Sequence, residues 1–344
     1  MWKILSYLQK NLSLAVPVFM AAGFITGLTI EKTAVLKEFI LPLTFLMVYP
    51  MMVTMQFKKI FEAGDSKLQI VTQFINFALI PFIAFLIGKV FFSGQPYLAL
   101  GFLLVSLLPT SGMTISWTGM SKGNMEAAVK MTVFGLLAGS FLTPFYIKGL
   151  MGTSISIPMT KIFLQIGTIV LLPMILGAVT QHLIIRRKGM EAWKNRIKKK
   201  FPPFSTLGVL SVVFIAMALK AESIMADPAA FFALIPSLLI LYGVNILIST
   251  FIAKRFFNRA DGLALVYGTV LRNLSIALAI AMTSFGKEGS EIALIIALGY
   301  IVQIQISAWY VRLSGKIFGP PQELEAGTGQ TGNKTIAPAE SGKG

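Results

Sequence analysis

Apolar residues in this chain gather in blocks of roughly 20, and each block is long enough to cross a hydrocarbon core about 30 Å thick as a helix. Inside lipid the backbone must satisfy its own hydrogen bonds, so repeated apolar blocks predict helices. The blocks lack the alternation of a membrane β-barrel. The pattern predicts an all-α integral membrane protein of ten spans. These spans are residues 12–30, 35–55, 68–92, 97–120, 125–149, 160–185, 204–221, 230–253, 262–285 and 289–312.

Lysine and arginine residues between the blocks predict how the spans are oriented. When the connecting segments are numbered alternately from the N-terminus, one side of the membrane holds 19 basic residues and the other holds seven. The richer side includes the dense cluster between residues 186 and 200. The positive-inside rule therefore places both termini in the cytoplasm of a cell-membrane protein. A difference this large also supports an even number of spans.

The basic loop at residues 186–200 divides the chain into two halves of five spans each. An odd number of spans per half gives the halves opposite orientations, so related halves would form an inverted repeat, which is common in secondary transporters. We expect five regions. They are an interfacial segment at 1–11, a first five-helix repeat at 12–150, the first helix of the second repeat with the basic loop at 151–203, the rest of that repeat at 204–315, and a disordered cytoplasmic tail at 316–344. A cleaved signal peptide is the alternative for the N-terminal region, because Ala21, Ala22 and Gly23 follow an apolar stretch.

The amino-acid composition argues against several classes of protein. The chain is 55% hydrophobic and 13% charged, whereas soluble domains carry about a quarter charged residues. The net charge of +16 resides mostly in short connecting segments, which indicates topology and anionic headgroups rather than nucleic-acid binding. The chain has no cysteine, so disulfides and thiolate chemistry are excluded. The sequence contains neither a phosphate loop nor an HExxH motif, so we expect no enzyme and no cofactor.

The fourth span carries a polar segment, Pro109 to Thr118, that predicts a broken helix. Pro109 removes a backbone donor, and Gly112 allows unwinding. Broken helix at membrane depth is tolerated where it is buried in protein or lines a cavity. The freed carbonyls and the hydroxyls of this segment are suited to a cation or a polar solute. The alternative is a proline kink whose hydroxyls bond back to their own helix.

The ninth span carries the second polar segment, Gly268 to Ser275. Arg272 lies well inside this apolar span, where an arginine costs roughly 3 kcal/mol on insertion scales, so it should face the protein interior or a wet cavity. Its guanidinium can bind a carboxylate bidentately. The alternative is a structural arginine satisfied by carbonyls and hydroxyls. Polar residues in neighbouring spans, among them Gln73, Asn76, Asn245 and Gln303, are expected to form interhelical hydrogen bonds.

These two segments resemble the bile acid:sodium symporter superfamily, including its arsenite-permease branch. The resemblance covers about residues 10–315. It rests on the ten-span plan, on breaks in spans four and nine, and on a proline-led polar segment that ends in a Lys-Gly-Asn turn at 122–124. It implies that spans four and nine cross. It also implies a panel of spans 1, 2, 6 and 7 and a core of spans 3–5 and 8–10.

The chain departs from the superfamily pattern at several functional positions. Bile-acid-type members place a Ser-Asn pair where this chain has Thr114 and Ile115, and a serine where it has Ala128. The resemblance places the glutamate of span nine at Gly268 and the following glutamine at Arg272. In arsenite permeases the essential cysteine matches Thr110 here and the glutamate of span nine matches Ser275, so thiolate handling of arsenic is excluded.

We therefore expect a secondary transporter of a small organic anion that works by alternating access. The expected substrate-binding residues are Arg272, Asn273, Thr110, Ser111, Thr269 and Asn76. The ion-binding candidates are Thr114, Thr118, Thr132 and Ser275. Sodium and protons are both open as the coupling ion. The alternatives are an arsenite or metalloid efflux permease and a membrane receptor that binds a solute without moving it. The expected partners are the bilayer and the substrate, and the sequence does not indicate an oligomeric state.

Overall fold

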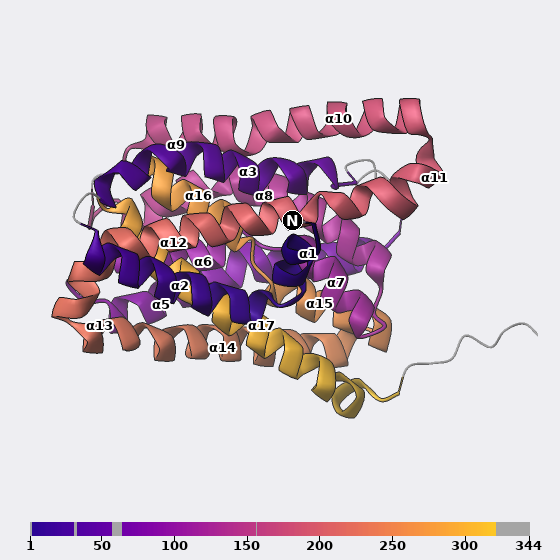
Figure 1. Ribbon diagram of the computed structural model, residues 1–344. Helices are drawn as coiled ribbons and strands as arrows, with labels where there is room; N and C mark the ends of the chain where they lie inside the picture. Colours follow the sequence, from indigo (N-terminus) through magenta and orange to yellow (C-terminus); the bar gives the residue numbers. More distant parts are fainter. Residues whose placement is uncertain (1, 31–32, 57–63, 156, 321–344) are drawn as a thin grey trace, which may run out of the picture.

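The computed structural model describes residues 2–30, 33–56, 64–155 and 157–320, and nearly all of them are helical (Figure 1). The helices of the first half are α1 (Trp2–Lys10), α2 (Leu12–Thr29), η1 (Thr33–Phe39), α3 (Ile40–Val53), α4 (Ser66–Phe74), η3 (Ile75–Leu79), α5 (Ile80–Phe91), α6 (Pro96–Leu107), α7 (Gly112–Met120) and α8 (Met125–Met151).

The second half continues with α9 (Met159–Ile166), η4 (Gly167–Leu171), α10 (Leu172–Lys188), α11 (Met190–Ala192), η5 (Trp193–Ile197), η6 (Lys198–Lys200), α12 (Pro202–Ala226), α13 (Pro228–Phe232), α14 (Leu234–Phe256), α15 (Arg259–Val270), α16 (Leu274–Ser284) and α17 (Gly289–Phe318). Within the described ranges, the one isolated β-bridge pairs Pro109 with Arg272, and neither residue belongs to a strand.

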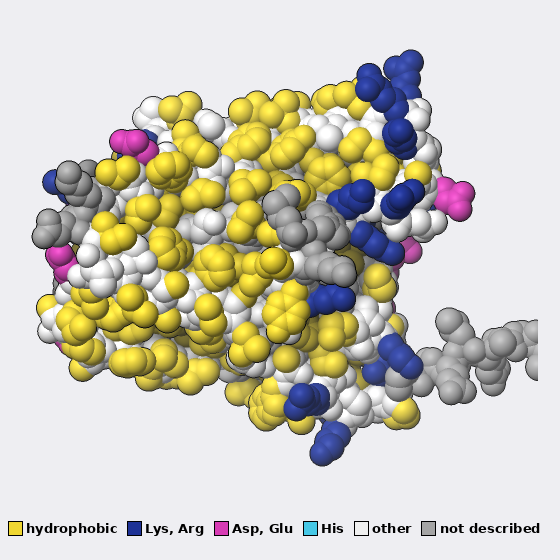
Figure 2. Space-filling view, viewed as in Figure 1, with side chains coloured by type: hydrophobic (Ala, Val, Ile, Leu, Met, Phe, Trp, Pro, Cys, Tyr) yellow, Lys and Arg dark blue, Asp and Glu magenta, His cyan; other side chains and the backbone are white. Residues whose placement is uncertain are grey.

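Within the described residues, seven helical stretches are long and apolar enough to cross a membrane, and eight if the bent pair α1 and α2 counts as one span. The helices α6 and α15 have 12 residues each, or about 18 Å at 1.5 Å per residue. Neither reaches across a membrane alone. Apolar side chains cover the middle of the face in Figure 2, and basic side chains gather at its right end. The chain is thus an all-α, multi-span membrane protein.

Close helix packing at glycines builds one group of helices: α2 and α3 both contact α12, and α10 contacts α3. Gly23 and Gly27 of α2 lie against the backbone of α12. A Cβ atom at either glycine would lie 2.3 Å from a carbonyl oxygen, that of Phe214 or that of Ala218. Small residues spaced four apart allow membrane helices to approach this closely. We call these four helices, together with η1 and α9, the panel group.

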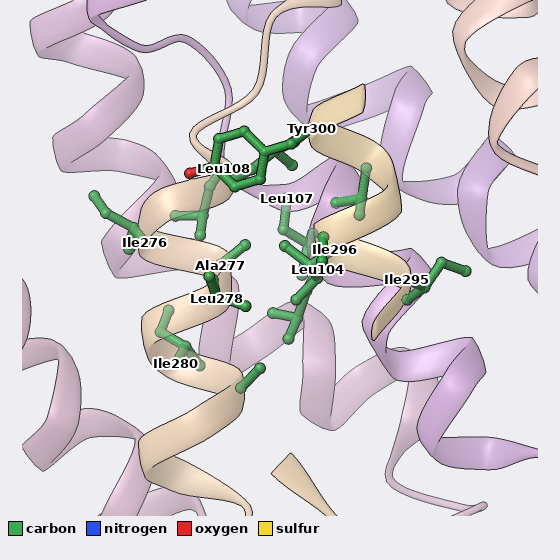
Figure 3. Packing of buried hydrophobic residues seen from close by; sticks show 14 of the residues in the cluster. Leu104, Leu107, Leu108, Ile276, Ala277, Leu278, Ile280, Ile295, Ile296 and Tyr300 are labelled. Atoms are coloured by element: carbon green, nitrogen blue, oxygen red, sulfur yellow. The ribbon is translucent and has the colours of Figure 1, made fainter. Parts of the chain in front are cut away.

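The helices α4 to α8 and α14 to α17 form the core group. Within it α6 packs on α17, and a Cβ at Gly101 would lie 2.5 Å from the carbonyl oxygen of Ile292. Figure 3 shows Leu104 and Leu107 of α6 beside Ala277 of α16 and Ile296 of α17, all four almost fully buried. This apolar packing holds the ends of α6 and α16 next to α17.

The structure corrects the expectation of a loop at 186–200, because this stretch is mostly helical. Helix α10 continues to Lys188, and α11, η5 and η6 follow. Trp193 is 4% exposed and its ring packs on Phe201 with centroids 5.9 Å apart. Burying this indole secures the turns against the bundle. Helix α1 bends from α2 by 107° and contacts α12. Most of the predicted tail lies outside the described residues.

Candidate functional site

The two predicted breaks are present, and they cross. Helix α6 ends at Leu107 and α7 begins at Gly112, while α15 ends at Val270 and α16 begins at Leu274. The amide of Thr110 donates to the carbonyl of Leu271 at 2.8 Å, and the amide of Asn273 donates to the carbonyl of Leu108 at 2.7 Å. Each break therefore satisfies backbone groups that the other leaves without a helical partner.

The first break is shorter than predicted, and local chemistry explains why. Ser111 accepts from the amide of Met113 at 3.2 Å, while Thr114 Oγ1 accepts from the amide of Ser111 at 3.1 Å. This reciprocal capping box starts α7 at once. Only Thr110 and Ser111 of the predicted hydroxyl set lie in the non-helical stretch; Thr114 and Thr118 belong to α7.

Thr110 takes a left-handed backbone conformation, with φ at 63°, which is uncommon for a β-branched residue. Its hydroxyl donates to the carbonyl of Pro109 at 2.6 Å. A Cβ at Gly135 of α8 would lie 2.5 Å from Thr110 Oγ1, so glycine at 135 leaves room for this side chain. The hydroxyl of Thr110 is thus held against the backbone of its own segment.

The second break begins α16 with a similar cap. Asn273 Oδ1 accepts from the amide of Ile276 at 3.3 Å. Helices α7 and α16 therefore both begin at the crossing, with 9 and 11 residues respectively. The N-terminus of a helix carries a partial positive charge. Two such ends at one place favour an anion there.

Arg272 lies at the centre of the crossing and is 2% exposed. Its backbone amide donates to Gln303 Oε1 at 2.7 Å, and Gln303 Nε2 donates back to the Arg272 carbonyl at 3.3 Å. The guanidinium atoms Nη1 and Nη2 are buried without a hydrogen-bond partner in the structure. The side chain is therefore a buried guanidinium whose two terminal nitrogens have no acceptor among the described residues.

Asparagine side chains from two other helices hold the last turn of α15. Asn76 Nδ2 donates to the carbonyl of Gly268 at 3.0 Å, and Asn245 Nδ2 donates to the carbonyl of Thr269 at 2.9 Å. Asn76 lies in η3, a π-helix, a local widening often found at functional sites. The predicted interhelical hydrogen bonds are confirmed for both residues. Gln73 instead has its amide atoms buried without a partner.

The four ion-binding candidates do not share one hydrogen-bond network. Thr132 Oγ1 donates to the carbonyl of Ala128 at 2.7 Å and to that of Ser111 at 3.5 Å, and Thr114 Oγ1 accepts from the amide of the same Ser111 in the cap of α7. The hydroxyl of Ser275 is hydrogen-bonded to that of Tyr300 at 2.6 Å. Thr118 Oγ1 is buried without a partner. Within the described ranges, no group of three or more acidic, histidine or cysteine side chains could hold a metal ion.

Three hydroxyl-bearing residues of this site were missed in the sequence: Tyr242, Ser249 and Tyr300. The Tyr242 hydroxyl donates to Gln303 Oε1 at 3.1 Å, and Ser249 Oγ is hydrogen-bonded to Thr269 Oγ1 at 2.6 Å. Tyr242 and Ser249 could have been found from their spacing. They lie three and four residues from Asn245, so all three polar side chains share one face of α14. Nothing comparable marks Tyr300.

Comparison with known proteins agrees with this architecture. The sequence model described as the Sodium Bile acid symporter family matches residues 41–227. The chain is 26% identical over 297 residues to the arsenical-resistance protein Acr3 of Alkaliphilus metalliredigens, with 80% of each chain covered. It is 24% identical to the Acr3 protein of Corynebacterium glutamicum over 88% of this chain and 87% of that protein. The chain is also similar to the sodium/bile acid cotransporter 7 of Xenopus tropicalis over a shorter stretch. The two are 30% identical over 92 residues, which cover 27% of this chain and 25% of that protein.

Proposed function

Because the chain belongs to the Sodium Bile acid symporter family, a family of membrane transporters, we propose that it moves a small organic anion across the cell membrane by alternating access. One observation carries the choice of an anion: Nη1 and Nη2 of Arg272 are buried without an acceptor. An uncompensated buried charge costs several kcal/mol. A carboxylate on the substrate would accept both donors at once.

The surroundings of Arg272 support the same substrate charge. The N-termini of α7 and α16 meet at the crossing, and each adds partial positive charge. The described chain gives Arg272 no ion pair, since the resolved ion pairs are Lys130–Asp65 and Lys220–Glu291. A bound anion would thus meet one full and two partial positive charges that the protein itself leaves unbalanced.

The transport cycle would use ten spans and a moving boundary between the panel group and the core group. In this proposal α6 with α7 forms span four and α15 with α16 forms span nine, so each broken pair crosses the membrane once. Both termini face the cytoplasm, as the excess of basic residues on that side predicts. Rocking of the panel group against the core group would expose the crossing to each side in turn.

We propose that sodium has little influence on this transport. The resemblance places stronger sodium ligands at Ile115, Ala128 and Gly268, and none of these side chains offers an oxygen atom. Arg272 adds a positive charge in the same region. At an effective dielectric constant near 20, two unit charges about 6 Å apart repel by roughly 3 kcal/mol, or about a hundredfold in affinity. A proton is the second coupling ion to test.

Counterflow in liposomes tests the proposal. The purified chain is first screened for thermal stabilisation by organic anions, and the best anion is then radiolabelled. A transporter exchanges this label across the membrane, whereas a receptor only binds it. Removing sodium or dissipating the pH gradient should identify the coupling ion. Steep sodium dependence would refute the role that we assign to Arg272.

Matched variants make the assay specific to the arginine. Arg272→Gln should abolish exchange, because the counter-charge is lost. Arg272→Lys should retain part of it, because the charge remains but the bidentate fork is lost. Arg312→Gln is the control, since Arg312 is exposed on α17, and it should exchange normally. Normal exchange by Arg272→Gln would contradict the proposal.

Arsenite efflux is the second candidate, and the two Acr3 relatives favour it because they align with most of the chain. The resemblance places the essential cysteine at Thr110, whose hydroxyl is tied to the carbonyl of Pro109 at 2.6 Å. The Thr110 hydroxyl therefore supplies no thiolate ligand for arsenic at the position where the resemblance places the cysteine. The organic anion therefore remains the first proposal.

A further inference from the structure

The outer face of α10 carries an apolar stripe that runs into a basic cluster. Exposed apolar side chains recur three or four residues apart, which places them on one face of the helix: Leu172, Leu176, Val179 and Leu183. Arg186 and Arg187 follow in the same register, and both are exposed. Figure 1 shows α10 along the edge of the bundle, and Figure 2 shows dark-blue side chains gathered at the end of that helix.

The length of the stripe matches one leaflet of a bilayer. From Leu172 to Leu183 the helix rises about 16 Å at 1.5 Å per residue, and half of a hydrocarbon core about 30 Å thick is about 15 Å. The two arginines therefore lie where the acyl chains end and the phosphates begin. A phospholipid molecule suits this arrangement, because its chains can lie on the stripe while its phosphate accepts from the guanidinium groups.

The turn that follows α10 adds further positive charge at the same level. Residues 186–200 contain eight basic residues and one acidic residue, Glu191. Because Trp193 is buried against Phe201, this turn is held on the bundle and does not extend into the solvent. Lys194 is exposed and Lys198 is half-buried, and they are four residues apart, a spacing at which like charges on a helix repel.

The protein supplies little negative charge to balance this cluster. The ion pairs printed among the described residues are Lys130–Asp65 and Lys220–Glu291, so the cluster has no carboxylate partner in that part of the chain. The negative end of α10 favours the cations of its own last turn, but this effect fades beyond one turn. Most of the charge of residues 189–200 is therefore available to an external anion.

We propose that the end of α10 and residues 189–200 form a binding site for one anionic phospholipid of the cytoplasmic leaflet. Basic clusters directly cytoplasmic of a membrane helix are typical of sites for anionic lipids, and each cation near the surface contributes roughly fivefold in affinity. Because α10 packs on α3, the lipid would attach the panel group to this leaflet. The site is separate from Arg272 and does not depend on the transported substrate.

Thermal unfolding of the full chain in detergent tests the site with three probes: dioleoylphosphatidylglycerol, dioleoylphosphatidylcholine and glycerol 3-phosphate. Phosphatidylglycerol should raise Tm and remain bound in native mass spectrometry, and the other two probes should do neither. An equal shift with phosphatidylcholine would show that the phosphate charge is irrelevant. An equal shift with glycerol 3-phosphate would indicate a site for a soluble phosphate. Either result would overturn the lipid site.

Two double variants measure how much the basic side chains contribute. Arg186→Gln with Arg187→Gln should weaken the binding of phosphatidylglycerol roughly 25-fold, at about fivefold for each cation. Lys194→Gln with Lys198→Gln should weaken it to a similar extent. Unchanged affinity in both double variants would refute the site.

A matched control separates a defined site from diffuse surface charge. Lys254→Gln with Arg255→Gln removes two exposed cations at the end of α14, a core helix that no comparable basic cluster follows. These cations lie on the same side of the membrane in the proposed topology, and their loss should change the affinity less than threefold. A loss equal to that of the Arg186 and Arg187 double variant would show that the lipid responds only to total charge, and the proposal would fail.

Discussion

Replacing Arg272 with methionine should stabilise the ligand-free protein, because the native guanidinium is buried with Nη1 and Nη2 unpaired. Leaving a buried donor unsatisfied costs about 1–3 kcal/mol, and more for a charged group. The backbone of Arg272 is held by Gln303, and the substitution leaves those hydrogen bonds in place. Methionine is flexible enough to fill most of the vacated space.

The expected gain is about 1–3 kcal/mol, after an allowance for imperfect packing of the new side chain. One kcal/mol shifts Tm by roughly 2 °C in the largest domains of the 150–250-residue class, so a rise of about 2–6 °C is expected here. The native chain should gain about 2.7 kcal/mol when the anion is present at 100 times its Kd. Arg272→Met should gain nothing from the anion.

Thermal unfolding in detergent, with and without the transported anion, measures both effects. Arg259→Met is the matched control, because the Arg259 guanidinium donates to the carbonyls of Lys122 and Ser121, both at 3.1 Å. Those hydrogen bonds would be lost, so the control should lower Tm. A fall in Tm for Arg272→Met together with a retained shift by the anion would show that the arginine is structural, and the reasoning about the site would fail.

Three further predictions address topology, substrate and packing. Reporter fusions after residues 200 and 316 should both read cytoplasmic, and a split result would contradict the ten-span proposal. Expression in an arsenite-sensitive bacterial strain should give little resistance, because Thr110 replaces the thiol; strong resistance would favour the second candidate function. Gly27→Ala should lower Tm and yield, because its Cβ would lie 2.3 Å from the carbonyl oxygen of Ala218, whereas Gly243→Ala, with no neighbouring atom within 4 Å, should not; equal effects would contradict the packing argument.

The sequence was sufficient to locate both breaks because their chemistry is local. Pro109 cannot donate to a helix, and Arg272 cannot lie in lipid without cost. The predicted length of the first break was wrong, because a segment rich in hydroxyl side chains was expected to be non-helical. Ser111 and Thr114 instead cap α7, so the hydroxyls that were expected to loosen the chain restart the helix.

Contacts between distant helices could not be predicted from the sequence. Gln303 holds the backbone of Arg272 from 31 residues away, and among many polar side chains nothing in the sequence selects this partner. Gly23 and Gly27 are recognisable as a close-packing pair only after α12 is known to lie against them. Lys37 of η1 and Lys287 before α17 likewise line one cavity between the helix groups, although nothing in the sequence connects the two positions.

The hydrogen bonds at the crossing favour an anion over a coordinated cation. Carbonyls freed by broken helices were expected to be available as ligands, yet those of Leu108 and Leu271 accept amides from the opposite break. The carbonyls of Gly268 and Thr269 accept asparagine side chains. A cation at these four carbonyls would share oxygens that already accept hydrogen bonds, and it would meet Arg272 as well, whereas Asn76 Oδ1 beside them is buried without a partner. Nη1 and Nη2 of that arginine are unpaired donors at the crossing, and an acceptor with negative charge is the group that suits them.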